Sequence, residues 1–493
     1  MKIIHIINSL TILLAVLVLW PKFKNNIKYI YEKILMFHYI LLIFSIFILQ
    51  HYWYENNLNF LQNNININFI NIKNLLINFS LNIDSISLVF IILTIFIFTL
   101  CIFYDLDKIS YKYKKKNIII WLILLELILI LIFSVSDIIL FYCFFEISLI
   151  PMIFIIGFWG NRFRKIKAIF YFFIFTLFGS ILLFGSFLYI VYTKNTSDYY
   201  LLLCENFTEN EQKYLWLAFF FGFGVKIPII PFHIWLPEAH VEAPTIGSVI
   251  LAALLLKLGG YGLLKFCLTF FPFANIYYNP LILTICTISI IYSTLTAIRQ
   301  NDLKRIIAYS SISHMNFVVL GIFSLNFEGI FGSILLMLGH GIISSALFFL
   351  IGILYERHNT RLIKYFSGLL QIMPIFSSIL FFFIISNISF PGTANFVGEF
   401  LILFGLIKNN TLITIIISIS LIFTLIYNIL LYNKLCMGNL KNNSIKHFQD
   451  INLKEFILFI PLIFLNLYIG IKPEIFYDLF KNNIFNLLLK YKI

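Results

Sequence analysis

Lys226 lies in a stretch, residues 216–233, that is apolar enough to sit in a membrane. A charge at the bilayer centre costs about 2.5–3.5 kcal/mol. Pro228 and Pro231 follow directly, and a proline inside a helix removes a backbone donor at a cost of about 3 kcal/mol. The carbonyls that lose their helical donors are those of Gly224 and Ile227. Such a segment persists only where it lines a protein cavity or a water path, which is how ion-translocating proteins build a site.

Two more ionisable residues sit deep in neighbouring apolar runs. Glu146 follows Phe141–Phe145; it could be a neutral carboxyl with one hydrogen bond, but nearby lysines favour a proton site whose pKa is set by burial against a cation. Lys257 lies about ten residues into its run, where snorkelling to the interface is difficult. A desolvated lysine can give up its proton, so Lys257 is a candidate relay.

Two histidines and a glutamate extend this set towards the C-terminus. His314 follows a serine-rich turn, and His340 has a glycine on each side. A lone buried histidine is usually a satisfied core residue, but two on adjacent spans suit a hydrated relay better. Glu399 comes eight residues after Pro391; it could cap a half-helix, but we favour a terminal proton site. The candidate proton-carrying residues are therefore Glu146, Lys226, Lys257, His314, His340 and Glu399.

Other polar residues in or beside the apolar runs have simpler interpretations. Glu126 could feed the same path or make a polar contact with a neighbouring helix, and the two are equally plausible. Asp137 starts a run, so we expect a structural role. The segment that follows Pro228 and Pro231 contains four potential metal ligands at a spacing that resembles a metal site, namely His233, Glu238, His240 and Glu242. Because they fall in a proline-rich interfacial loop, we do not expect them to bind a metal.

The composition excludes most soluble classes of protein. The 493 residues are 61% hydrophobic and only 12% charged, whereas a soluble domain has about 25% charged residues. The net charge of +13 would suggest nucleic acid in a soluble chain, but in a membrane chain the positive-inside rule accounts for it and no nucleic-acid partner is expected. Six scattered cysteines form no metal or cluster motif, and no nucleotide-binding fingerprint occurs, so we expect no cofactor in this chain.

The run lengths predict an all-α polytopic membrane protein with about fourteen transmembrane helices. The first run is interpreted as a retained span. The twelfth is too long for one straight helix and, with Ser389–Thr393 inside it, is expected to be two half-helices. The predicted spans are 3–20, 34–50, 83–104, 118–135, 137–157, 168–192, 214–235, 247–268, 278–298, 303–323, 330–354, 367–407, 411–433 and 453–471.

The connecting segments predict an orientation. Segments after odd-numbered spans hold 23 Lys and Arg residues, and those after even-numbered spans hold five. The odd-numbered side is therefore expected to face the negative compartment, matrix or cytoplasm, with both termini opposite. Within the external loop 51–82, alternation at 64–69 favours a short β-ribbon as much as a disordered loop. Residues 474–493 have apolar positions at helical spacing, which predicts an interfacial helix or one docked on a partner subunit.

Spans 4–8 and 9–13 form two groups of five. The fourth member of each group is proline-broken and carries Lys226 or Glu399, and an odd number of spans inverts the second copy. Such paired interruptions indicate the ion path of a transporter. The predicted regions are 1–117 (three helices and the loop), 118–268 and 278–434 (the inverted repeats), and 453–493 (the last span and terminal helix).

Several motifs resemble those of the antiporter-like subunits of respiratory complex I. They include the string Val225–Thr245, the segment Leu256–Gly262 and the segment Asp302–Met315. Glu399, within Phe396–Phe400, stands where a related subunit of this family has lysine, and so favours one mitochondrially encoded branch. The resemblance covers about residues 80–435.

The resemblance implies a charged line along the membrane midplane made by the six residues named above, which proton pumping would use. It implies that flavin, iron–sulfur clusters and quinone belong to partner subunits, that the partners are other membrane-arm subunits and phospholipids, plausibly cardiolipin, and that the location is the mitochondrial inner membrane. Two alternatives stay open: a subunit of a multisubunit cation/proton antiporter, and a non-pumping scaffold.

Overall fold

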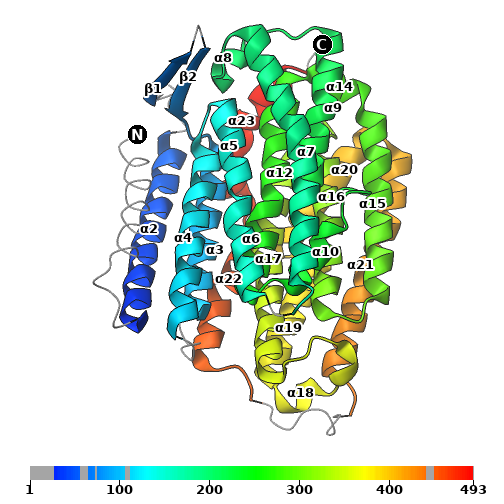
Figure 1. The fold of residues 1–493 in the computed structure, drawn as a ribbon. Helices are drawn as coiled ribbons and strands as arrows, with labels where there is room; N and C mark the ends of the chain where they lie inside the picture. The colour runs from blue at the N-terminus through cyan, green and yellow to red at the C-terminus, as the bar shows by residue number, and fades with distance from the viewer. Residues whose placement is uncertain are drawn as a thin grey trace. The chain divides into compact units, whose positions relative to one another are not determined.

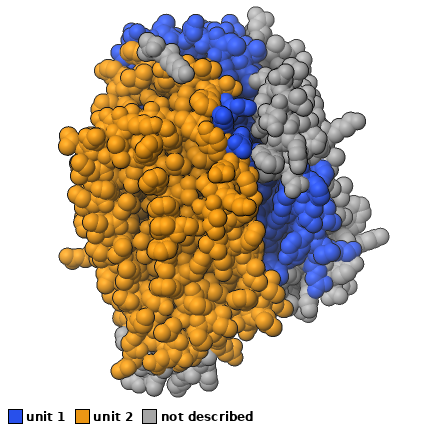
Figure 2. Space-filling model, turned by 180° about the vertical axis from the view of Figure 1, so that it is seen from behind, with its two compact units in different colours: residues 1–160, 177–222, 478–483 blue, residues 161–176, 223–477, 484–493 orange. Residues whose placement is uncertain are grey.

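The computed structural model describes residues 27–55, 65–72, 75–105, 112–160, 162–439 and 449–491. The chain divides into two compact units (Figure 2). Unit 1 comprises residues 1–160, 177–222 and 478–483, and unit 2 comprises residues 161–176, 223–477 and 484–493. The predicted first span, 3–20, lies outside the described residues. The inverted repeats stay a prediction.

Unit 1 holds the N-terminal helices, drawn from blue to teal in Figure 1. Its polar cap residues explain where some helices begin: the side chain of Asp137 accepts hydrogen bonds from the first turn of α5, and Asp198 does the same for α8. Asp137 therefore has the structural role expected of it. The elements are α2 (Ile27–Glu55), α3 (Ser85–Asp105), α4 (Lys112–Ser134), α5 (Ile138–Ile147), α6 (Leu149–Trp159), most of α7 (Lys165–Lys194), α8 (Tyr199–Leu203) and most of α9 (Glu209–Lys226).

The polar loop between α2 and α3 forms a β-hairpin in unit 1. Strand β1 (Ile65–Ile72) pairs antiparallel with β2 (Leu75–Leu81), with a register shift between Asn68 and Ile70. The alternation of apolar and polar residues in this segment is the pattern of a strand with two different faces. Of the two interpretations that the alternation left open, the structure supports the β-ribbon.

Unit 2 is a bundle of helices in which α17 packs against α16, α19, α20 and α22. Its longest helix, α17 (Phe327–His358), is buried along its apolar window. The others are α10 (Trp235–Glu242), α11 (Thr245–Ile250), α12 (Leu256–Gly262), α13 (Leu268–Phe270), α14 (Pro272–Tyr277), α15 (Asn279–Arg299), α16 (Leu303–Ile322), α18 (Leu369–Ile372), α19 (Pro374–Asn387), α20 (Ala394–Asn409), α21 (Thr411–Cys436) and α22 (Leu453–Ile471). The π-helical turns η2 (Leu251–Leu255) and η3 (Leu263–Cys267) flank α12, and the 3-10 turn η4 (Ile363–Tyr365) precedes α18.

Within the described residues, eight helices are long and apolar enough to cross a membrane, and Ile118–Ser134 and Pro374–Asn387 are shorter apolar helices. The chain is thus a helical multi-pass membrane protein, although the count of fourteen is not reproduced by this criterion. The predicted division of residues 367–407 into two half-helices is confirmed by α19 and α20. The predicted terminal helix is α23 (Glu474–Leu489). The prediction that residues 236–246 form a loop is wrong in part, because α10 occupies most of them. Pro237 lies in the first turn of α10, where a helix tolerates the missing backbone donor.

Candidate functional site: a buried polar line in unit 2

Lys257 lies on α12, between the two π-helical turns, and its side chain is fully buried. Its Nζ donates to the carbonyl of Ala252, at 2.5 Å, and lies 2.8 Å from Nδ1 of His340. Ala252 belongs to η2, and π-helical turns inside helices often occur at functional sites because they displace backbone carbonyls from the regular ladder. When lysine donates, Nδ1 of His340 accepts; when the lysine is neutral, the roles can reverse. A proton can therefore cross this contact.

His340 on α17 and His314 on α16 are neighbours. Their ring centroids are 5.5 Å apart with the planes at 45°, and each residue is 1% exposed. Beside His340, α17 also packs closely on α20. A Cβ on Gly339 would meet Oδ1 of Asn395 at 2.8 Å, so only glycine allows α20 to lie this near. The structure brings together the two histidines that the sequence singled out.

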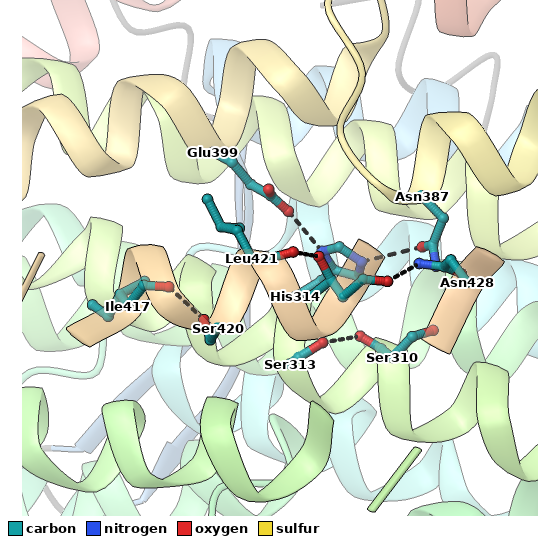
Figure 3. A network of polar contacts seen from close by, with 10 residues as sticks. Ser310, Ser313, His314, Asn387, Glu399, Ile417, Ser420, Leu421 and Asn428 are labelled. Carbon is teal, nitrogen blue, oxygen red and sulfur yellow. Dashed lines mark hydrogen bonds and ion pairs between the residues drawn. The ribbon is translucent and has the colours of Figure 1, made fainter. Parts of the chain in front are cut away.

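Glu399 on α20 pairs with His314 (Figure 3). Nδ1 of His314 lies 2.9 Å from Oε1 of Glu399, and Nε2 lies 3.1 Å from Oδ1 of Asn387. The amide nitrogen of Asn387 donates to Oδ1 of Asn428, at 3.0 Å. Because Oδ1 of Asn387 can only accept, Nε2 carries a hydrogen. The other ring proton is then shared between Nδ1 and the carboxyl group, as an ion pair or as its neutral form.

The break between α19 and α20 places Glu399. Residues 388–393 include Ser389 at φ 66° and Gly392 at φ 92°. Asn466 on α22 spans the break: its amide nitrogen donates to Oγ of Ser386 on α19, at 2.8 Å, and its oxygen accepts from the backbone N–H of Ala394, at 3.2 Å. The first backbone N–H groups of a helix have no acceptor inside the helix. Asn466 supplies an acceptor for one of them at the start of α20. Sequence reasoning missed Asn466, Asn387 and Asn428, although asparagine inside an apolar span is itself a signal.

Lys226 is the last residue of α9, where the first proline pair breaks the helix. The lysine is 4% exposed. The carbonyl of Gly224, expected to lose its donor, accepts instead from the N–H of Ile229 at 3.1 Å. Nε1 of Trp235 donates to the carbonyl of Val225 at 3.0 Å. Glu146, on α5, belongs to unit 1 and Lys226 to unit 2, so their pairing stays a prediction.

The four residues with metal-like spacing take separate partners. Glu238 pairs with Arg305 at 2.8 Å. The ring of His240 stacks on Phe348 with centroids 4.8 Å apart, and the ring of His233 meets Tyr292 edge-on. Glu242 faces the fully buried Arg361, whose Nη2 lies 3.9 Å from the carboxylate. These contacts fix the segment after the first break rather than gather ligands around one point.

Glu126 makes a polar contact with a neighbouring helix. Its Oε2 lies 2.7 Å from Nε2 of His38, and both side chains are buried in unit 1. His38 also bonds the carbonyl of Ile34, one turn earlier on α2, at 2.8 Å. Of the two roles that the sequence left open for Glu126, this contact supports the structural one. His38 was not singled out from the sequence.

Within unit 2, then, four buried ionisable side chains form one contiguous line: Lys257, His340, His314 and Glu399. A lysine, two imidazoles and a carboxyl group each bind and release one proton, and neighbours in this line are within hydrogen-bond distance or in ring contact. Hydrogen-bond distances join Lys257 to His340 and His314 to Glu399, and the two imidazole rings between them are in contact. Burial of ionisable groups in a membrane span is costly, so it indicates a functional site.

A family described as NADH:quinone oxidoreductase/Mrp antiporter, transmembrane, matches residues 135–424. NADH-ubiquinone oxidoreductase chain 4 from Marchantia polymorpha is 50% identical over 412 residues, which cover 84% of this chain and 83% of that one. The chain 4 from Arabidopsis thaliana is 49% identical over the same shares. That from Chondrus crispus is 51% identical over 398 residues, covering 81% of this chain and 80% of that one.

Two solved structures share the fold. A chain of respiratory complex I from Thermus thermophilus with bound NADH superposes with a TM-score of 0.86 at 22% identity, over 99% of this chain and 100% of that one. A chain of the membrane-bound sulfane sulfur reductase, an archaeal respiratory membrane complex, also gives 0.86 at 19% identity, over 100% and 99%. At these identities the likeness extends to the fold alone.

Proposed function

We propose, since this chain belongs to the NADH:quinone oxidoreductase/Mrp antiporter family and within it to the chain 4 subunits of NADH-ubiquinone oxidoreductase, that it is a proton-translocating membrane-arm subunit of respiratory complex I. This is the branch that Glu399 favoured in the sequence. The observation that carries the proposal is the continuous line from Lys257 to Glu399, whose members are buried and touch in series.

In the proposed mechanism, Glu146 and Lys226 form an ion pair that a neighbouring subunit's charge opens and closes. Opening the pair removes the partner that stabilises the ammonium of Lys226, so its proton passes to Lys257. The proton then crosses to His340 and His314 and reaches Glu399, which releases it towards the positive side. Moving one proton against the potential takes about 2.3 kcal/mol per 100 mV. Separating a buried ion pair changes the free energy by about 3–5 kcal/mol, which is enough.

The remaining parts of the assignment follow from the proposed role. The chain would contribute no redox centre, with flavin, iron–sulfur clusters and quinone held by partner subunits. Its partners would be the other membrane-arm subunits, including neighbouring antiporter-like ones, and membrane phospholipids such as cardiolipin. It would lie in the mitochondrial inner membrane with the Lys- and Arg-rich segments in the matrix and both termini in the intermembrane space.

Replacing Glu399 by glutamine tests this function. The variant keeps the side chain's shape and a hydrogen-bonding oxygen but cannot accept a proton. The assembled complex is reconstituted in proteoliposomes, and protons moved per electron passed from NADH to quinone are measured. We expect the ratio to fall.

Glu328→Gln is the matched control, because Glu328 lies on α17 in a partly exposed ion pair with Lys408 at 2.5 Å, outside the buried line. Exposed pairs of this kind contribute about 0–1 kcal/mol, so its ratio should stay at the wild-type value. An unchanged ratio in Glu399→Gln would overturn the assignment.

A further inference from the structure

The start of α7 and the turn before it carry four positive side chains within six residues, the α7 basic cluster. None of the four is in an ion pair within the part of the chain that the structure describes. The sequence has no acidic residue between Glu146 and Asp198, so neighbouring positions do not balance the charge either. The members of the cluster are the exposed Arg162, Arg164 and Lys167 and the partly exposed Lys165.

Other arginines of unit 2 that lie in Lys- and Arg-rich segments do have carboxylate partners. Arg305 pairs with Glu238 at 2.8 Å, and Arg357 pairs with Glu455. These charges are neutralised within the chain and fix one segment to another. The α7 basic cluster has no such carboxylate among the described residues, so its counter-charge comes from elsewhere.

An exposed apolar stripe continues from the cluster along one face of α7. The opposite face is packed, because the buried ring of Phe172 contacts Trp235 on α10 with centroids 5.4 Å apart. Nζ of Lys167 lies 5.4 Å from the ring centroid of Tyr171, so the charge adjoins aromatic surface. The spacing of four, three and one residues keeps the stripe on one side of the helix. Its members, each 41–59% exposed, are Ile166, Phe170, Phe173 and Ile174.

The length of α7 places the cluster at the level of lipid headgroups. The helix has 30 residues and rises about 45 Å at 1.5 Å per residue, whereas the hydrocarbon core is about 30 Å thick. Its first turn therefore extends into the headgroup layer, and the apolar stripe below it lies beside the acyl chains. Clusters of about four to eight Lys and Arg residues next to a membrane span are typical of sites that recognise anionic lipids.

We propose that the α7 basic cluster binds the phosphate headgroup of an anionic phospholipid whose acyl chains lie along the apolar stripe. Arg162 and Arg164 supply planar guanidinium groups that can donate two parallel hydrogen bonds to phosphate oxygens, and Lys165 and Lys167 supply compact positive charges. A zwitterionic phospholipid carries its own ammonium group beside the phosphate, so it offers the cluster less counter-charge. The site is therefore selective for lipids with a net negative headgroup.

Photoactivatable lipids test the site in the assembled complex. Endogenous lipid is first exchanged in detergent, and the complex is reconstituted in phosphatidylcholine vesicles. These contain, at equal mole fraction, phosphatidylglycerol or phosphatidylcholine with a diazirine near the start of one acyl chain. After illumination, lipid-bearing peptides are quantified by mass spectrometry. We expect the phosphatidylglycerol probe to label residues 163–174 at least about fivefold more, because each nearby Lys or Arg favours an anionic lipid by about that factor.

The combined change Arg162→Gln, Arg164→Gln and Lys167→Gln removes three charges of the cluster and keeps polar side chains, so the preference for phosphatidylglycerol should disappear. Arg357→Gln is the matched control. It removes a positive charge at the end of α17, where Glu455 is the partner, and the preference at α7 should remain.

Three outcomes would overturn the proposal. Equal labelling of the segment by both probes in the unsubstituted complex would show ordinary bilayer lipid there. Labelling by neither probe would show that a protein partner covers the segment. A preference that survives the triple change would show that other groups select the lipid.

The inference goes beyond the proposed function and can fail separately from it, because it requires only that the chain spans a membrane. An unchanged proton ratio in Glu399→Gln would refute the proposed function without altering the labelling result. The loss of the lipid preference from the labelling result would refute the site and leave proton translocation untouched.

Discussion

The two broken helices of this molecule are held in different ways. Where α9 ends at Lys226, most of the groups that complete the break come from the same segment: Ile229 donates to Gly224, and Trp235 donates to Val225. One bond comes from another span, because the N–H of Ile230 donates to Oγ of Ser289 on α15, at 3.3 Å. Where α19 ends at Asn387, part of the completion comes from another span, because Asn466 of α22 bonds Ser386 on one side and Ala394 on the other.

The difference shows how each break can move. The first is stabilised mostly by contacts within about ten residues, so its geometry depends mainly on the segment that carries Lys226. The second depends on α22, so any displacement of that helix changes the start of α20 and with it the distance between Glu399 and His314. The position of Glu399 is therefore set by tertiary contacts, and that of Lys226 largely by local ones.

The largest effect is expected from Asn466→Leu. The change removes both hydrogen bonds and leaves the hydroxyl of Ser386 and the N–H of Ala394 buried without these partners. Each such loss costs about 1–3 kcal/mol, so the two together should destabilise the region by about 2–6 kcal/mol. We expect a lower melting temperature of the complex and a lower ratio of protons to electrons.

Asn452→Ala is the control for this change, since it alters an asparagine of the same helix at an exposed capping position. Losing a helix cap costs about 1 kcal/mol, and the proton ratio should not change. A normal proton ratio in Asn466→Leu would show that α22 does not position Glu399.

A smaller effect is expected from Trp235→Phe at the first break. Phenylalanine keeps most of the ring's packing and removes only the hydrogen bond to the carbonyl of Val225, at a cost of about 1–3 kcal/mol. Because Ile229 still bonds Gly224, the break should keep its shape and the proton ratio should fall less than in Asn466→Leu. Measuring both variants at equal electron-transfer rates checks the order; the reverse order would contradict the contrast between local and tertiary control.

Sequence patterns predicted the breaks better than they predicted what holds them. Pro228, Pro231 and Pro391 reveal local interruptions, because a missing donor is a property of one residue. Alternation at 64–69 left a β-ribbon and a disordered loop equally open, because it does not state whether a pairing strand follows; the pairing of β1 with β2 decides between them. The partners of His314 and of the second break lie 72 to 85 positions away. No sequence pattern within one helix predicts which distant side chain an asparagine will contact. The free-energy cost of burying an ionisable group in an apolar span identified His314, His340 and Glu399 as unusual. Only the packing of α16, α17 and α20 brings them together.

The smallest effect that still distinguishes the second break comes from Gly392→Ala. Gly392 has φ 92°, a conformation that costs an L-residue about 1–3 kcal/mol, and its Cβ would meet nothing within 4 Å. Gly438, after α21, has φ 90° and equally open surroundings, so Gly438→Ala should cost as much stability. Only Gly392→Ala strains the link between α19 and α20, so only it should lower the proton ratio. If both variants lose stability equally and pump normally, the link tolerates strain without moving Glu399, and Asn466 alone sets that position.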